Sequence, residues 1–533
     1  LLFIFIFSFC NLIVHIMFSS RVLNLVIKIL FYQSLLLLFF IGFVLLTSNP
    51  FLYSIFIHID GLELNPILQD FALTIHPPLI YIGYVFTSSI YVFAVVFYLT
   101  KMREIILINY IRIMSIITWS FLTIGIFLGS WWSYYELGWG GYWFWDPVEN
   151  TALMPWIILT MLIHSINNNK NFLKLSVFCL CLLSFLFSIL GLFFVRSGIL
   201  MSVHVFANDL YRGYFIFIFF LFLLIFSIYL IINFKIFLLS IYKYSLNNIY
   251  LSFNTIIFSI ILIVVFIGTV VPPIYLHLFN NNITIGASYY NFLLISIIIS
   301  MLSLLIIFTI NNYNQIYLKR NNFYFIIGYS LVVICVLIYI DISWLTYLGN
   351  IILFLTFLLI GSIIFKIKYY IRNNKHSTII SHIGFSIFII GAIISNLGQY
   401  EVIKIISPGQ SVKIRNVEYI FRGINYSIND NFHSYFGNFL VKISNKNTTL
   451  FPEKRYYFVK GIYTSKSNIK SNILSDIYAM IGDGNIVNGW YIRLYHSPLM
   501  MLVWFGSILM FLSGIILIIY LCLIKPKKYI DWL

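Results

Sequence analysis

The chain has 533 residues and a formal net charge of +16 at pH 7, with 61% hydrophobic and only 9% charged residues. This composition, with a mean hydropathy of +0.98, excludes a water-soluble globular protein and indicates a polytopic membrane protein. The five cysteines, Cys10, Cys179, Cys181, Cys335 and Cys522, form no Cys-x-x-Cys pair. We therefore expect neither a structural zinc site nor a thioredoxin-like redox centre.

Apolar runs of about 20 residues are candidate membrane spans, and the chain contains about thirteen of them. They lie near residues 1–18, 29–47, 78–100, 113–130, 152–166, 175–195, 214–234, 251–271, 291–310, 323–340, 347–365, 379–396 and 498–524. The first run has no basic region before it and no small-residue cleavage site after it, so we expect no cleaved signal peptide.

Basic residues alternate along these connections. One set of connecting segments and the C-terminal tail hold 18 of the 32 Lys and Arg, whereas the alternate short loops hold two, Arg196 and Arg212. The positive-inside rule places the basic loops in the matrix or cytoplasm. The remaining twelve Lys and Arg lie in segment 397–497. The net positive charge of the chain therefore mostly reflects its membrane topology and requires no nucleic-acid partner.

Residues 131–156 read WWSYYELGWGGYWFWDPVENTALMPW and face the compartment opposite the basic loops. Aromatic faces stack on flat apolar ligands, and glycines let the backbone approach them closely. An aromatic belt at the membrane surface is the alternative. The ordered string G-W-G-G-x-W-x-W-D favours a ligand platform and resembles the WWD signature of haem-handling membrane proteins. The platform residues are Trp131, Trp132, Trp139, Gly140, Gly141, Trp143, Trp145 and Asp146.

Charged residues near this loop have structural alternatives. Asp146, Pro147 and Glu149 fit an N-cap, a first-turn proline and an N3 carboxylate, and we favour this capping role over direct chemistry. Arg196 and Arg212 are candidates for pairing with carboxylates of a bound ligand, or for anchoring at lipid headgroups.

Two histidines lie at matched depth on different predicted spans. His164 is three residues before Asn167, and His382 is five residues after Ser377, both measured from the basic-loop side. Two imidazoles at equal depth are able to bind one iron from both faces, as in a b-type haem. Hydrogen bonding within the bundle is the alternative.

A second pair of histidines lies on the opposite side. His76 precedes two prolines at the start of the third span, and His204 follows the Val195–Gly198 stretch. Both flank the tryptophan-rich loop. We expect either axial ligands of a second haem or ordinary interfacial histidines.

Segment 397–497 alternates apolar and polar residues, as in Ser411–Arg415, which is typical of strands. Turn signals occur at Pro408-Gly409, Arg422-Gly423 and Asp483-Gly484. We predict a β-rich domain on the side of the tryptophan-rich loop. The predicted organisation is therefore an all-α membrane region (1–396), this domain (397–497), and a final span with a basic tail (498–533).

Several segments together resemble the CcmF family of membrane haem lyases. They are LNPILQDFALTIHPPLIYIGYVF (64–86), the tryptophan-rich loop, VRSGILMSVHVFANDLYRG (195–213), FPEKRYYF (451–458) and GWYIRLYHSPLMMLVW (489–504). The resemblance implies that His76 and His204 ligate a substrate haem presented by the loop. It implies that His164 and His382 hold a permanent haem b. Residues 272–350 match only weakly, and no role is carried over to them.

The resemblance also implies partners and a location. Expected partners are a haem chaperone of the CcmE type, apocytochrome c, a thiol-reducing subunit that holds the apocytochrome, and membrane lipids. The W-G-G-x-E-G-S loop of bacterial relatives is not found, so we expect a separately encoded N-terminal CcmF fragment. Heavy use of Phe, Ile, Tyr and Asn favours an AT-rich genome and hence the mitochondrial inner membrane, with a bacterial plasma membrane as the alternative.

The function implied is a haem lyase that positions haem for thioether formation with the Cys-x-x-Cys-His cysteines of apocytochrome c. The alternatives are a protein that only loads haem onto a chaperone and a non-catalytic subunit of a respiratory complex. A haem absorbance spectrum distinguishes the haem proteins from the last class.

Overall fold

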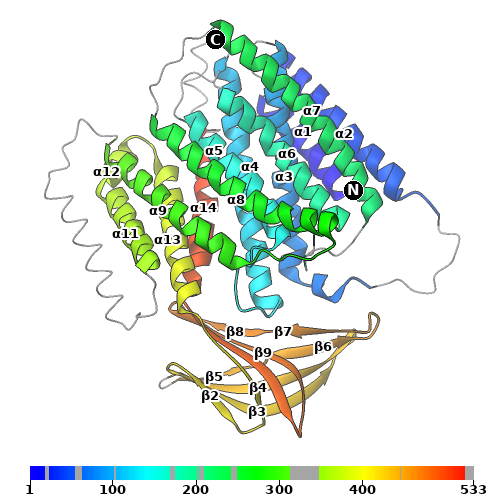
Figure 1. Cartoon of the computed structure of the whole chain (residues 1–533), viewed down its shortest axis with the longest axis vertical. Helices are drawn as coiled ribbons and strands as arrows, with labels where there is room; N and C mark the ends of the chain where they lie inside the picture. The colour runs from blue at the N-terminus through cyan, green and yellow to red at the C-terminus, as the bar shows by residue number, and fades with distance from the viewer. Residues whose placement is uncertain are drawn as a thin grey trace.

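The computed structural model shows a helical bundle with a β-sandwich at one end (Figure 1). It describes residues 1–18, 23–53, 63–100, 104–167, 175–200, 202, 209–241, 249–311, 347–443 and 446–521. The predicted span near 323–340 lies outside these residues.

Helices account for the remaining twelve predicted spans. They are α1 (Leu2–Phe18), α2 (Leu23–Ser48), α3 (Phe71–Thr100), α4 (Glu104–Glu136), α5 (Pro147–Asn167), α6 (Leu175–Ser197), α7 (Leu210–Ile241), α8 (Ile249–Phe279), α9 (Ala287–Asn311), α11 (Tyr347–Phe365), α13 (His376–Gly398) and α14 (Met500–Ile519). Two short helices, η1 (Pro66–Leu68) and α12 (Ile367–Arg372), complete the described helical part.

Ten of the described helices are long and apolar enough to cross a membrane: α2, α3, α4, α6, α7, α8, α9, α11, α13 and α14. The apolar helix α1 is shorter, at 17 residues. Helix α5 is not among the ten; its first turns carry Glu149, Asn150 and Thr151, which lower its hydropathy. The predicted class, a polytopic helical membrane protein with one β-rich domain, is confirmed.

Helix α3 begins earlier than the apolar run predicted. The run was expected to start at Pro78, but the helix starts at Phe71 and includes both Pro77 and Pro78. Asp70 caps it, since its carboxylate accepts a hydrogen bond from the Ala72 amide at 2.9 Å. Prolines are tolerated near the start of a helix because few main-chain bonds are lost there. This extension places His76 inside the helix instead of in a loop.

Helices α4 and α5 are joined by a reciprocal pair of indole hydrogen bonds. The Trp119 indole donates to the Thr160 hydroxyl at 2.9 Å, and the Trp156 indole donates to the Thr123 hydroxyl at 2.8 Å. The two indoles are stacked, with ring centroids 5.8 Å apart. An indole N–H inside a membrane must find a partner within the protein. This contact therefore fixes α5 against α4.

The β-sandwich comprises β1 (Tyr400–Ile406), β2 (Ser411–Ile414), β3 (Val417–Ile428), β4 (Phe432–Ile443), β5 (Lys446–Leu450), β6 (Glu453–Tyr457), β7 (Ile462–Lys466), β8 (Asn468–Ser471), β9 (Ser475–Asn485) and β10 (Gly489–Pro498). One antiparallel sheet has the order β1-β10-β9-β8, and the other has β2-β3-β4-β6-β7 with β5 beside β4. Alternate residues of the two sheets form a common core that includes Phe421, Phe439, Ile477 and Leu494.

One of the three predicted turns in this domain is confirmed. Gly409, with φ of 90°, lies in the turn between β1 and β2. Arg422-Gly423 instead forms a bulge within β3, where the register shifts between Phe421 and Gly423. Asp483-Gly484 lies inside β9, and the chain turns after Asn485. A glycine in a strand marks a bulge or a close approach as readily as a turn.

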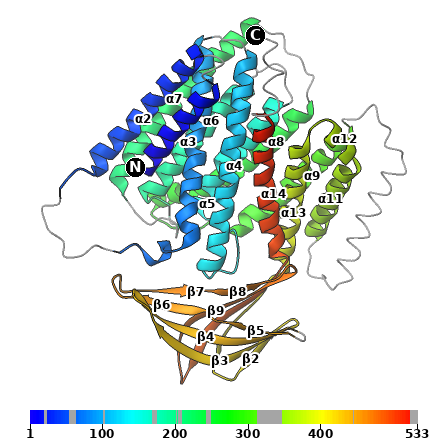
Figure 2. The same ribbon diagram turned by 180° about the vertical axis from the view of Figure 1, so that it is seen from behind.

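The sandwich is inserted between two adjacent helices, α13 and α14 (Figure 2). Its first and last strands pair directly, with Tyr400 opposite His496. The strand pair β1–β10 thus continues the helix pair α13–α14. This arrangement brings the sandwich against the end of α4 and the tryptophan-rich loop.

Candidate haem-binding site

The tryptophan-rich loop connects α4 to α5 and has no helix or strand between residues 137 and 146. Trp145 ends it in a left-handed conformation, with φ of 57°. The Trp145 ring stacks on Tyr290 of α9 at 4.5 Å between centroids and 7° between planes. The Asn150 amide donates to both the Trp145 carbonyl oxygen (3.2 Å) and the Tyr290 hydroxyl (3.0 Å). One face of this predicted platform residue is therefore covered by the protein itself.

The other predicted platform tryptophans differ in exposure and orientation, and the loop begins later than predicted because Trp131 and Trp132 lie in the last turns of α4. Trp143 meets Trp145 edge to face, with centroids 5.9 Å apart, and Trp139 meets Phe144 in the same way at 4.6 Å. Trp131 is 39% exposed, whereas Trp132 is only 1% exposed and packs among residues of α3. Trp131 is thus accessible, and Trp132 is a core residue.

The predicted cap of α5 is present in the structure. The Asp146 carboxylate accepts a hydrogen bond from the Val148 amide at 3.0 Å. The Glu149 carboxylate accepts from the Asp146 amide at 3.2 Å and from the Phe144 amide at 3.0 Å. This is a capping box with one additional bond into the loop. The Ser202 hydroxyl donates to the same Asp146 carboxylate at 2.6 Å, so Asp146 also joins the loop to the segment after α6.

The two intramembrane histidines meet. His164 of α5 and His382 of α13 have ring centroids 6.3 Å apart. Their Nδ1 atoms lie 2.8 Å from the carbonyl oxygens of Thr160 and Thr378, one turn earlier in each helix. A carbonyl only accepts, so each Nδ1 carries the proton and each Nε2 carries the lone pair.

The spacing of the rings fits a single iron between them. Two metal–nitrogen bonds of about 2 Å each, with each ring centre roughly 1 Å beyond its nitrogen, place the centroids about 6 Å apart. The 6.3 Å separation of His164 and His382 agrees with this value. Both histidines are about 25 Å along their helices from the ends that face the sandwich, at 1.5 Å per residue.

His76 lies on the sandwich side of the bundle, on α3. Its Nδ1 donates to the Gly125 carbonyl oxygen of α4 at 2.7 Å, which leaves Nε2 with the lone pair. A side chain at Gly129 would lie 2.5 Å from the His76 ring, so only glycine permits this contact. His76 is thereby held in one orientation. His204, its predicted companion, lies outside the described residues.

The two arginines expected near a ligand carboxylate lie next to Asp209. Arg212 pairs with Asp209 at 3.2 Å and donates to the Thr47 carbonyl oxygen at 3.3 Å. Arg196 lies in the last turn of α6, where its carbonyl oxygen accepts from the Asp209 amide at 3.4 Å. Asp209 therefore links these two predicted positions.

The sandwich contributes a buried carboxyl beneath the loop. Asp476 of β9 has no exposed surface and accepts a hydrogen bond from the Tyr134 hydroxyl of α4 at 3.1 Å. Burial raises the pKa of Asp476 from 3.8 to about 6, although the bond from Tyr134 lowers it. The carboxyl is thus a polar contact between sandwich and bundle that becomes charged near neutral pH.

Sequence reasoning missed Asn150, Tyr290 and Asp476. Each contacts a partner far along the chain, and neither hydropathy nor periodicity reports such contacts. Tyr495 and Gln399, which contact the loop from the sandwich side, were missed for the same reason.

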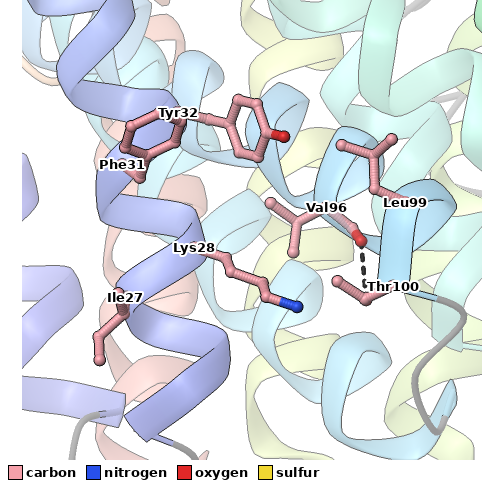
Figure 3. Close-up of a pocket in the computed structure, with 7 residues that line it drawn as sticks. All are labelled: Ile27, Lys28, Phe31, Tyr32, Val96, Leu99 and Thr100. Atoms are coloured by element: carbon pink, nitrogen blue, oxygen red, sulfur yellow. Dashed lines mark hydrogen bonds between the residues drawn. The ribbon is translucent and has the colours of Figure 1, made fainter.

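A separate recess of about 290 Å³ lies between α2 and α3 (Figure 3). Lys28 and Thr100 line it together with five apolar or aromatic residues. Thr100 is at the opposite end of α3 from His76, about 36 Å away at 1.5 Å per residue. This recess is not part of the site around the loop.

Comparisons with known proteins agree with this arrangement. Residues 1–201 match the family described as Cytochrome C assembly protein, and residues 398–498 match the CcmF C-terminal beta-sandwich. The chain is 31% identical to the cytochrome c-type biogenesis protein CcmF of Escherichia coli, over 96% of this chain and 80% of that protein. It is 33% identical to NrfE of Haemophilus influenzae, over 88% and 76%. A solved structure titled Cytochrome c Heme Lyase CcmF shares the fold, with a TM-score of 0.75 and 19% identity over 96% of this chain and 81% of the other.

The cap at Asp146 generates a first prediction. Asp146→Ala removes the acceptor for the Val148 amide and should lower stability by about 0.5–2 kcal/mol. Asp146→Asn retains a capping oxygen and should change stability by only about a few tenths of a kcal/mol. Thermal melts of the two purified variants measure the difference. If both variants are as stable as the unmodified protein but both lose haem binding, the carboxylate has a chemical role instead.

Asp476 generates a prediction about pH. Its raised pKa means that its contribution to stability is full below about pH 4 and is lost as the pH rises through about 6, because the folded state then buries a charge. Asp476→Asn removes this charge. The stability of the variant relative to the unmodified protein should rise by about 1–2 kcal/mol between pH 5 and pH 8. Parallel pH profiles for the two proteins in thermal melts would contradict the assignment.

Proposed function

The chain belongs to the CcmF family of cytochrome c-type biogenesis proteins, and from this membership we propose that it acts as a haem lyase in cytochrome c maturation. The observation that carries the proposal is the meeting of His164 and His382 at 6.3 Å within the bundle. A pair of intramembrane imidazoles with the lone pairs at Nε2 is suited to ligating a metal centre such as haem iron.

In this proposal the intramembrane pair holds a permanent haem b. His164 and His382 would hold the group through Nε2, and the carbonyls of Thr160 and Thr378 orient the two rings through Nδ1. The group supplies a one-electron couple when it is bound. Membrane helices on either side keep water from the ligands and hold both rings at one depth.

A second haem is the substrate and occupies the opposite side. His76 and His204 are the proposed axial ligands, and the partly buried rings of the tryptophan-rich loop support the porphyrin face. The contact of His76 with Gly125 and Gly129 supports this assignment, because it holds the imidazole in one tautomer and orientation. We include Arg196 and Arg212 as contacts for the haem propionates; Arg212 would exchange its present partner Asp209 for a propionate.

The reaction joins apocytochrome thiols to the haem vinyl groups. Each thiol adds across a vinyl double bond, so one S–C and one C–H bond form while the S–H bond and the C=C π bond break, with no net transfer of electrons. This addition requires no nucleophile from the lyase. The residues of this chain act by positioning the haem and excluding water.

The proposal names three partners by their chemistry. A haem chaperone of the CcmE type delivers the substrate, an apocytochrome c supplies the thiols, and a subunit keeps those thiols reduced. We place the loop and sandwich in the mitochondrial intermembrane space, or in the periplasm if the protein is bacterial. The concentration of basic residues in the opposite loops supports this orientation.

The resident haem generates a prediction. His382→Ala should abolish the bis-histidine haem absorbance of protein purified from haem-replete cells, because one of two axial ligands is lost. His376→Ala is the matched control, since His376 is exposed at the start of the same helix. Reduced-minus-oxidised spectra of both variants measure the effect. Retention of the same spectrum by His382→Ala would refute the site.

The external site generates a separate prediction. His76→Ala should leave the resident haem in place but reduce haem attachment to cytochrome c to background. His277→Ala, on an exposed position near the sandwich-side end of α8, serves as its control. The measurements are the resident-haem spectrum and the yield of covalent cytochrome c. If His76→Ala removes the resident haem first, the two-site arrangement is wrong.

A further inference from the structure

The sandwich contacts the tryptophan-rich loop mainly through the main chain of the loop. The Tyr495 hydroxyl of β10 lies 3.0 Å from the Trp139 carbonyl oxygen. Gln399, the residue after α13, donates to the Gly140 carbonyl oxygen. Ser467 donates to the carbonyl oxygen of Tyr135, at the end of α4. These bonds hold the backbone of the loop and do not involve its indole rings.

The loop has little order of its own. In the part of the chain that the structure describes, residues 138–145 make no main-chain hydrogen bond to one another. Three of the first five of these positions are glycine. Such a segment has many accessible conformations, and fixing it costs conformational entropy. Its shape therefore depends on contacts from outside.

Tyr495 contacts the loop with its ring as well as with its hydroxyl. Its side chain packs against Gly140, where a Cβ would lie 2.3 Å from the tyrosine ring. Gly140 also has φ of +75°, a conformation that suits glycine. The position of Gly140 is thus defined from the sandwich side by the ring and by the bond to Gln399.

Two charged residues, Glu401 and Arg493, fix the position of the Tyr495 side chain. The Glu401 carboxylate lies 2.9 Å from the Tyr495 hydroxyl and accepts from the Arg493 guanidinium. Arg493 also lies over the Tyr495 ring, 5.1 Å from its centroid. Burial and Glu401 raise the pKa of Tyr495, so the hydroxyl keeps its proton and shares it between Glu401 and the Trp139 carbonyl oxygen.

We propose that the β-sandwich holds the tryptophan-rich loop in its haem-presenting shape, with Tyr495 as the principal positioning residue. The inference rests on the proposed function for its haem part. It assigns to the sandwich a role in ordering the platform before haem arrives. A loop that is already ordered binds haem more tightly, because the conformational entropy of the loop has already been lost on folding.

Tyr495→Phe tests the proposal, because it keeps the ring against Gly140 and removes only the hydroxyl. Tyr419→Phe is the matched control: Tyr419 is buried in the same sandwich, and its hydroxyl donates to the Tyr495 carbonyl oxygen at 3.0 Å and not to the loop. Gln399→Leu removes the second donor. Hydrogen exchange of amides 138–145 reports loop order. Titration with ferric haem, with His76→Ala as the blank, reports platform affinity.

Tyr495→Phe should raise amide exchange in the loop by about tenfold and weaken His76-dependent haem binding by about tenfold, the effect of roughly one hydrogen bond. Gln399→Leu should act in the same direction. Tyr419→Phe should change neither quantity, and all three variants should keep the resident-haem spectrum.

Unchanged exchange in Tyr495→Phe would overturn the proposal, as would faster exchange with unchanged haem affinity. Absence of His76-dependent haem binding in the unmodified protein would instead refute the proposed function of the loop. The exchange measurements would then still decide whether the sandwich orders it.

Discussion

Main-chain polar groups cannot be left unpaired in hydrocarbon, and this constraint determines where the chemistry of this protein lies. Within the membrane the described chain is helical, so any ligand there must be held by side chains of helices. His164 and His382 are two such side chains. Irregular backbone such as residues 137–146 lies beyond the ends of α4 and α5. In the proposed function, the planar substrate is therefore presented at the end of the bundle, and the permanent haem lies inside it.

Helices α5 and α13 connect the tryptophan-rich loop to the intramembrane histidines. Helix α5 begins at the loop with the Asp146 cap and carries His164 near its other end. Helix α13 carries His382 near its start and ends beside Gln399, which contacts the loop. Each helix thus relates the loop to one histidine through about 25 Å of rigid backbone. The indole bonds between α4 and α5 add a third connection, because α4 leads directly into the loop.

Much of this could be predicted from sequence. Hydropathy and the alternation of basic loops identified the helices, and a rise of 1.5 Å per residue was enough to match the depths of His164 and His382. The predicted start of α3 was wrong because the apolar run was counted from Pro78, whereas the helix begins at Phe71 and tolerates both prolines near its start. Contacts such as Tyr495 with Trp139, or Trp145 with Tyr290, were not predictable, since they join residues far apart that carry no shared local pattern.

The insertion of the sandwich between α13 and α14 bears on how firmly it can hold the loop. A domain joined by a single linker is free to pivot, and its contacts with a loop would then be transient. Here both connections lie side by side, with β1 paired to β10 immediately beyond the two helix ends. Tyr495 and Gln399 are both at this junction, within a few residues of the membrane helices. The groups that contact the Trp139 and Gly140 carbonyls are therefore placed by the bundle itself, and the loop is held between two parts of one rigid framework.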